Sequence, residues 1–163
     1  GGSGTWTLAW LRAVPDARVI LFDVPPVVPM ARERFARRGV LDRVELVPGN
    51  YLEDDLPEGA DVAWLSAIVH QNSRAENRRL YRRVADALPK GGRILIRDIV
   101  MEQGHVHPAG GALFAVNMLA GTETGGTYTM DEFREDLASA GFEDVTHLYA
   151  DPGMHNVVSA IRS

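Results

Sequence analysis

Apolar residues along this chain follow two alternating patterns: short continuous runs, and longer segments in which apolar positions recur every three or four residues. The short runs predict buried β-strands, and they lie at 18–22, 44–47, 61–65, 93–100, 145–149 and 156–161. The longer segments predict amphipathic helices, and they lie at 5–14, 25–39, 73–88, 112–119 and 129–141. Strands that alternate with helices indicate a parallel sheet with helices on both faces.

Local signals fix several boundaries of these elements. Ser73–Glu76 and Thr129–Glu132 each have the spacing of a capping box, which marks the start of a helix. Asp151-Pro152-Gly153 separates the last two strands by a tight turn, so these strands must run antiparallel. We therefore predict one α/β domain over 1–163, with a Rossmann-like, mostly parallel sheet that ends in an antiparallel strand pair.

Composition and charge exclude several classes of protein. The 163 residues carry a net charge of −5, which does not favour a nucleic-acid partner. The chain has no cysteine, so it has neither a disulfide framework nor a thiolate metal site. No apolar run approaches the length of a membrane helix and no segment resembles a signal peptide, so we expect no membrane partner and a cytoplasmic location.

The first residues form a glycine-rich turn, Gly1-Gly2-Ser3-Gly4, directly before a predicted helix. Asp23 follows about 20 residues later, after the strand at 18–22. This arrangement is typical of a site for an adenosine-containing cofactor, because glycines let the backbone approach the ligand and the acid accepts hydrogen bonds from the ribose. In this arrangement a strand leads into the glycine turn, so we expect the first strand of the sheet to precede Gly1 in the sequence. Within the sheet, that strand would lie between the strands at 18–22 and 61–65.

Six short motifs are spread along the chain. They are Gly1-Gly2-Ser3-Gly4-Thr5, Phe22-Asp23-Val24-Pro25, Gly49-Asn50-Tyr51, Ser66-Ala67-Ile68-Val69-His70, Leu88-Pro89-Lys90-Gly91-Gly92-Arg93-Ile94-Leu95-Ile96 and Gly125-Gly126-Thr127-Tyr128-Thr129. In this order they resemble the motifs of class I S-adenosylmethionine-dependent O-methyltransferases, and most of all the group that includes plant caffeate and flavonoid O-methyltransferases and bacterial natural-product relatives. The resemblance covers nearly the whole chain, and the antiparallel ending agrees with it.

The resemblance implies S-adenosylmethionine as cofactor and S-adenosylhomocysteine as product. Glycines of the first turn would pack under the methionine portion, Asp23 would bind the ribose, and Asn50 stands where the family has an acid against the adenine. An amide oxygen can still accept a hydrogen bond from the adenine amino group. The implied cofactor-binding residues are Gly1, Gly2, Gly4, Asp23, Val24, Asn50, Tyr51 and Ser66.

His70 is the candidate catalytic base. It follows the strand at 61–65, at the carboxyl end where open α/β sheets place their sites, and imidazole suits proton transfer at neutral pH. The resemblance implies that His70 removes the proton of the acceptor hydroxyl, and that Asp98 orients and charges it. From the residues alone, His70 could instead be a loop or packing residue, and Asp98 could cap a strand or pair with Arg93 or Arg97.

The resemblance also implies a small-molecule acceptor, and four residues would bind it: Asn72, Asn117, Met118 and Tyr128. Two of these positions depart from the family. Gln71-Asn72 replaces the usual Asp-Trp after the histidine, and Tyr128 replaces a second acid beside it. Met118 could equally be an ordinary core residue. His105 and His107 have no identifiable third ligand, so we predict no metal site and expect both to face solvent.

Three functions remain open at this point. The first is an O-methyltransferase that acts on an aromatic or polyketide-like hydroxyl. The second is a cofactor-binding relative with lost or altered chemistry, such as a hydroxylase-like or regulatory protein. The third, a nicotinamide-dependent oxidoreductase, is disfavoured by the antiparallel ending and by His70. The resemblance further implies a homodimer formed through an upstream helical domain.

Overall fold

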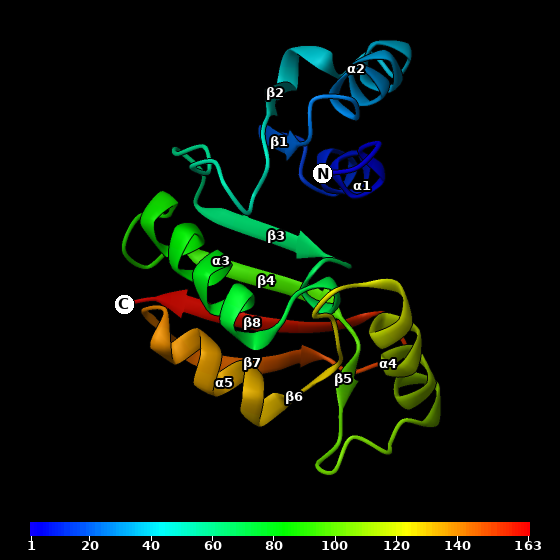
Figure 1. The fold of residues 1–163 in the computed structure, drawn as a ribbon. Coiled ribbons are helices and arrows are strands. Elements are labelled where there is room, and N and C mark those ends of the chain that lie inside the picture. The colour runs from blue at the N-terminus through cyan, green and yellow to red at the C-terminus, as the bar shows by residue number, and fades with distance from the viewer. The chain divides into compact units, whose positions relative to one another are not determined.

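The computed structural model describes residues 1–163 and divides into two compact units, Gly1–Ala60 and Asp61–Ser163. Figure 1 shows both units as a ribbon. Each has its own strands and helices and is described by itself below. None of the helices is long and apolar enough to cross a membrane.

The first unit is a short parallel strand pair with helices packed against it. Strand β1 pairs with β2 from Val19↔Val44 to Asp23↔Pro48. The buried apolar residues form one cluster, whose members are Leu8, Leu11, Leu21, Ala31, Phe35 and Val44. The elements are α1 (Thr5–Ala13), β1 (Val19–Asp23), α2 (Val28–Arg37), the 3₁₀ turn η1 (Leu41–Arg43) and β2 (Val44–Pro48).

The helix boundaries in this unit follow from glycine and proline. Gly4, with φ of 82°, directly precedes α1, a conformation that glycine adopts without strain. Gly39, with φ of 66°, follows α2 at the position where left-handed glycines often end helices. Helix α2 begins at Val28, later than the Pro25-Pro26 signal predicted, because residues 25–27 form a turn and Pro29 occupies the first helical turn.

The second unit contains a four-stranded sheet in the order β3-β4-β8-β7. Strands β3 and β4 are parallel, whereas β8 is antiparallel to both β4 and β7. The antiparallel ending predicted from the sequence and the mixed α/β class are therefore confirmed. The strands of this sheet are β3 (Val62–Ser66), β4 (Arg93–Asp98), β7 (Phe142–Tyr149) and β8 (Asn156–Arg162).

Three helices and a small second strand pair complete this unit (Figure 1). Both predicted capping boxes are confirmed: Ser73 accepts from the Glu76 amide at the start of α3, and Thr129 accepts from the Glu132 amide at the start of α5. The remaining elements are the 3₁₀ turn η2 (Val69–Gln71), α3 (Arg74–Ala87), β5 (Val100–Met101), α4 (Ala109–Gly121), β6 (Tyr128–Thr129) and α5 (Met130–Ser139).

The prediction of one continuous strand over 93–100 is wrong at its carboxyl end. Strand β4 ends at Asp98, and the chain then turns into β5, which pairs in parallel with β6 from Val100↔Tyr128 to Met101↔Thr129. A strand of two residues has no alternation of apolar and polar positions, so this second pairing could not be predicted from the sequence pattern. Helix α4 also begins earlier than predicted, because the low helix propensity of Gly110 and Gly111 concealed its first turn.

Candidate active site

The first unit brings the glycine turn and Asp23 together. Asp23 is the last residue of β1, and its Oδ2 accepts hydrogen bonds from the nitrogens of Gly1 at 2.9 Å and Gly2 at 2.7 Å. Its Oδ1 accepts from the Val24 amide at 2.8 Å. Asp23 is therefore a fixed carboxylate at the carboxyl end of a strand.

Asn50 and Tyr51 follow β2, and the Gly49 amide donates to the Asp23 carbonyl at 2.9 Å. Asn50 Oδ1 accepts from the Leu52 amide at 3.1 Å, which closes a local turn. One lone pair of the Asn50 oxygen is thus already used, and the other is left for a ligand. Both residues are partly exposed at this end of the strand pair.

Gly4 is required for packing as well as for conformation. A Cβ at Gly4 would lie 2.1 Å from Cζ of the buried Phe35, and the positive φ would add strain.

We expect Gly4→Ala to destabilise the protein by about 2–3 kcal/mol and to weaken cofactor binding. Gly2→Ala is the matched control, because Gly2 also has a positive φ, of +56°, but a Cβ there meets no atom within 4 Å. Thermal unfolding should show a clearly larger loss for Gly4→Ala, and equal losses would contradict the packing argument.

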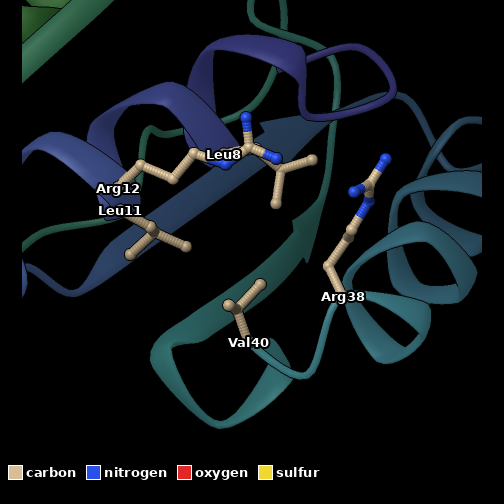
Figure 2. Close-up of a pocket in the computed structure, with 5 residues that line it drawn as sticks. All are labelled: Leu8, Leu11, Arg12, Arg38 and Val40. Atoms are coloured by element: carbon tan, nitrogen blue, oxygen red, sulfur yellow. The ribbon is translucent and has the colours of Figure 1, made fainter.

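A hollow of about 250 Å³, lined by none of the residues predicted to bind the cofactor, lies in the first unit beside α1 and the end of α2 (Figure 2). Its lining is Leu8, Leu11, Arg12, Arg38 and Val40, and no predicted site residue belongs to it. The two arginines lie in the last turn of α1 and at the end of α2, where a cation interacts favourably with the helix dipole. This explains both arginines without a ligand.

The second unit brings His70 and Asp98 together. His70 lies in η2, just after β3, and Asp98 ends the neighbouring strand β4. His70 Nδ1 lies 2.9 Å from each carboxylate oxygen of Asp98, and both side chains are buried, at 8% and 2% exposure. The Ile99 amide donates to Asp98 Oδ1 at 2.8 Å and fixes the carboxylate further.

The alternative partners considered for Asp98 bond elsewhere. Arg93 donates to Ser159 Oγ at 2.8 Å, and Arg97 donates to Ser66 Oγ at 2.7 Å. Neither arginine has an ion pair with Asp98. The carboxylate of Asp98 therefore bonds to the imidazole of His70 and not to a surface guanidinium.

The Asp98 contact assigns the tautomer of His70. A carboxylate only accepts hydrogen bonds, so Nδ1 carries the proton and Nε2 has a free lone pair in the neutral ring. Phe114 on α4 packs edge-on against the imidazole, with centroids 4.9 Å apart and planes at 86°. Sequence reasoning missed Phe114, and the only signal was its position four residues before Met118 on the same helix. An imidazole held in this way can accept a proton at Nε2.

The other predicted site residues of this unit differ in their exposure and in their hydrogen-bond partners. Ser66 ends β3, and its hydroxyl accepts from Arg97. Asn72 is buried, and its amide donates to Asn77 at 3.0 Å, so in this structure its side chain holds the turn after His70 and does not face outward. Asn117 is exposed and Met118 is half-buried on α4. Tyr128 bonds to the main-chain carbonyl of Asn72 and not to the His70 ring.

The loop histidines differ from each other. His107 is exposed, as expected. His105 Nε2 lies 3.3 Å from a carboxylate oxygen of Glu132, so it has a protein partner although nearly half its side chain is exposed. No group of three His, Cys, Asp or Glu side chains has the arrangement of a metal site in residues 1–163.

The fold is of the mixed α/β class shared by several solved O-methyltransferases. An O-methyltransferase family 2 protein from Planctomyces limnophilus DSM 3776, solved with apigenin, superposes with a TM-score of 0.87 and 32% identity over 100% of this chain and 49% of that chain. Human N-acetylserotonin methyltransferase, solved in complex with SAM, superposes with a TM-score of 0.88 and 25% identity over 100% of this chain and 46% of that chain.

Sequence comparison gives the family. The model of the O-methyltransferase domain family matches residues 1–143, and the chain belongs to this family. It is 34% identical to 3-hydroxy-5-methyl-1-naphthoate 3-O-methyltransferase of Streptomyces sahachiroi, over 100% of this chain and 47% of the relative. It is 31% identical to the mitomycin biosynthesis 6-O-methyltransferase of Streptomyces lavendulae, over 100% and 46%. The chain thus spans about half the length of these curated relatives.

Proposed function

We propose that this chain is the catalytic part of an S-adenosylmethionine-dependent O-methyltransferase that methylates a hydroxyl of a small aromatic or polyketide-like molecule. The observation that carries the proposal is the buried His70–Asp98 pair with its free Nε2 lone pair, in a chain of the O-methyltransferase family. The relatives named for a hydroxynaphthoate and for mitomycin biosynthesis support the acceptor class.

The residues of the first unit fit the cofactor. Fixed backbone nitrogens and the Asp23 carboxylate meet at the carboxyl end of β1, as ribose binding requires. A Cβ at Gly1 would lie 2.4 Å from Leu21 Cγ, so the turn is packed closely on the strand beneath it. Gly1, Gly2, Gly4 and Asp23 would hold the cofactor here. The cofactor supplies a methyl group activated by its bond to a sulfonium.

The second unit supplies the proton acceptor. His70 Nε2 would accept the proton of the acceptor hydroxyl as that oxygen takes the methyl group, which the cofactor would give up from its sulfonium to leave S-adenosylhomocysteine. The imidazolium so formed would be stabilised by the Asp98 carboxylate, whose two oxygens each lie 2.9 Å from Nδ1. The contact with Phe114 keeps the ring in the orientation that this transfer needs.

Calorimetric binding tests this function first. The full-length protein is titrated with S-adenosylmethionine and S-adenosylhomocysteine, with NAD as the control ligand. We expect dissociation constants on the order of micromolar for the two sulfur ligands and no binding of NAD. If neither sulfur ligand binds, the glycine turn, Asp23 and Asn50 do not form a working site and the methyltransferase proposal fails.

We also propose that the protein acts in the cytoplasm as a homodimer, with an upstream helical domain that forms the dimer and covers the acceptor. Helix α4 supports a covering segment, because Leu113, Val116 and Leu119 on it are 61–79% exposed, which is unusual for large apolar side chains. Mass measurement by light scattering on the full-length protein tests this proposal. A monomer would contradict it.

A further inference from the structure

Residues 122–128, which are the loop after α4 and the first residue of β6, contact the main chain of the His70 turn at His70 and at Asn72. The Gly126 amide donates to the His70 carbonyl at 2.9 Å, and the Tyr128 hydroxyl donates to the Asn72 carbonyl. The Gln71 amide already bonds within the turn, to the Ile68 carbonyl at 3.0 Å. The main chain on either side of Gln71 is therefore held from outside the turn by one loop.

Gly125 permits this contact. A Cβ at Gly125 would lie 2.5 Å from the His70 carbonyl oxygen and 3.2 Å from Gln71 Cα. Backbone atoms cannot move aside as a flexible side chain can, so any larger residue would push the loop and the His70 turn apart. The close approach of the loop to the catalytic turn thus depends on a single glycine.

The loop is itself anchored at both sides. Thr122 Oγ1 donates to the Met118 carbonyl at 2.6 Å and accepts from the Gly125 amide at 2.8 Å, which ties the loop to the end of α4. Thr124 Oγ1 donates to Glu76 at 2.5 Å, which ties the loop to the start of α3. The Thr124 hydrogen bond, and then those from Ser73, lower the pKa of Glu76 to about 2, so this anchor stays charged at neutral pH.

Tyr128 acts on the main chain and not on the imidazole. Burial, and next the charge of Glu132, raise the pKa of Tyr128 to about 12, so its hydroxyl remains a hydrogen-bond donor at neutral pH. Asp98 is thus the one carboxylate bonded to the His70 ring in this structure.

We propose that residues 122–128 form a positioning clamp, in which Gly125, Gly126 and Tyr128 fix the main chain of the His70 turn and so direct Nε2 toward the acceptor. This inference rests on the proposed function, because it assigns the clamp to the base of that reaction. Small displacements of a catalytic group can cost on the order of 10²-fold in rate, so such a clamp has a measurable effect.

Two variants and two matched controls test the clamp in the full-length protein. Tyr128→Phe removes only the hydroxyl, and Tyr149→Phe makes the same change at a side chain that is 58% exposed. Gly125→Ala introduces the backbone clash, and Gly121→Ala adds the same methyl where nothing lies within 4 Å. The expected results differ between the variants and their controls in two independent measurements.

The first measurement is the ¹⁵N NMR spectrum of His70, identified by its loss in His70→Gln. We expect a single Nδ1–H tautomer in the wild type and both controls, and exchange broadening or mixed tautomers in Tyr128→Phe and Gly125→Ala. This readout needs no turnover. Unchanged His70 signals in both clamp variants would overturn the proposal, whatever the enzyme's activity.

The second measurement compares two hydroxynaphthoate acceptors, one unsubstituted and one with a nitro group that lowers the phenol pKa. We expect the clamp variants to lose about 10-fold in kcat with the unsubstituted acceptor and less than about threefold with the largely ionised one, with an unchanged KM for the cofactor. A purely structural defect would lower both rates equally and would contradict the clamp. If His70→Gln leaves the rate with the unsubstituted acceptor unchanged, His70 is not the base and the clamp has no base to position; the proposed function fails separately, if the full-length protein binds neither sulfur ligand.

Discussion

Replacement of His70 by alanine is expected to lower kcat by about 10²- to 10⁴-fold while cofactor binding stays within about twofold of the wild type. The imidazole is the only group in this structure with a buried carboxylate at one nitrogen and a free lone pair at the other. Without it, the acceptor hydroxyl must lose its proton to water, and the attack on the methyl carbon is slower. Steady-state kinetics with an unsubstituted hydroxynaphthoate and calorimetry with S-adenosylhomocysteine measure the two quantities.

Two further variants separate the loss of the base from a loss of folding. His70→Ala leaves the buried Asp98 carboxylate with only the Ile99 amide as partner, which destabilises the protein. His70→Gln offers Asp98 an amide donor and should fold better, yet it should be equally slow. His107→Ala, at an exposed loop position, should retain full activity. A His70→Gln enzyme with wild-type kcat would remove His70 as the base.

The second large effect is expected for Asp98→Asn, with a loss of about 10²- to 10³-fold in kcat. The asparagine oxygen can keep the hydrogen bond from the Ile99 amide, which in the wild type reaches Oδ1 at 2.8 Å. The amide nitrogen would then face His70 Nδ1 and donate to it. This hydrogen bond favours the tautomer with its proton on Nε2, which turns the proton acceptor into a donor.

The control for Asp98→Asn is Asp86→Asn, which makes the same change at an exposed position of α3 and should have no effect on kcat. The double variant His70→Ala with Asp98→Asn should be no slower than His70→Ala alone, because Asp98 acts through the imidazole. Additive losses in the double variant would show that Asp98 has a separate role. The NMR spectrum of His70 in Asp98→Asn should show the changed tautomer directly.

Local sequence signals were sufficient for most of the elements. The capping boxes at Ser73 and Thr129 set the starts of two helices, because each is closed by hydrogen bonds between residues of its own first turn. The turn at Asp151-Pro152-Gly153 predicted the antiparallel ending, since so short a connection cannot join parallel strands. Gly125 belongs to a glycine-containing motif of the sequence, but its closeness to the His70 carbonyl could not be predicted from the neighbouring residues.

The candidate site likewise combines features that the sequence predicted with features that it could not predict. The sequence placed His70 and Asp98 after neighbouring strands, and parallel pairing brings the ends of such strands together. It could not give the partners of Tyr128 and Asn72, because a hydroxyl or amide bonds to whichever polar group the fold brings near, here the Asn72 carbonyl and Asn77.

By itself the sequence determined the α/β class and most helix and strand positions, because periodicity, capping and turn chemistry act over a few residues; its resemblance to the O-methyltransferases implied the candidate base and its acid. Only the tertiary structure decided the break after Asp98, the pairing of β5 with β6, the contact of Phe114 with the imidazole, and the clamp over the His70 turn. These features join residues that are far apart in the chain, and the free energy of such contacts depends on packing that no local pattern encodes.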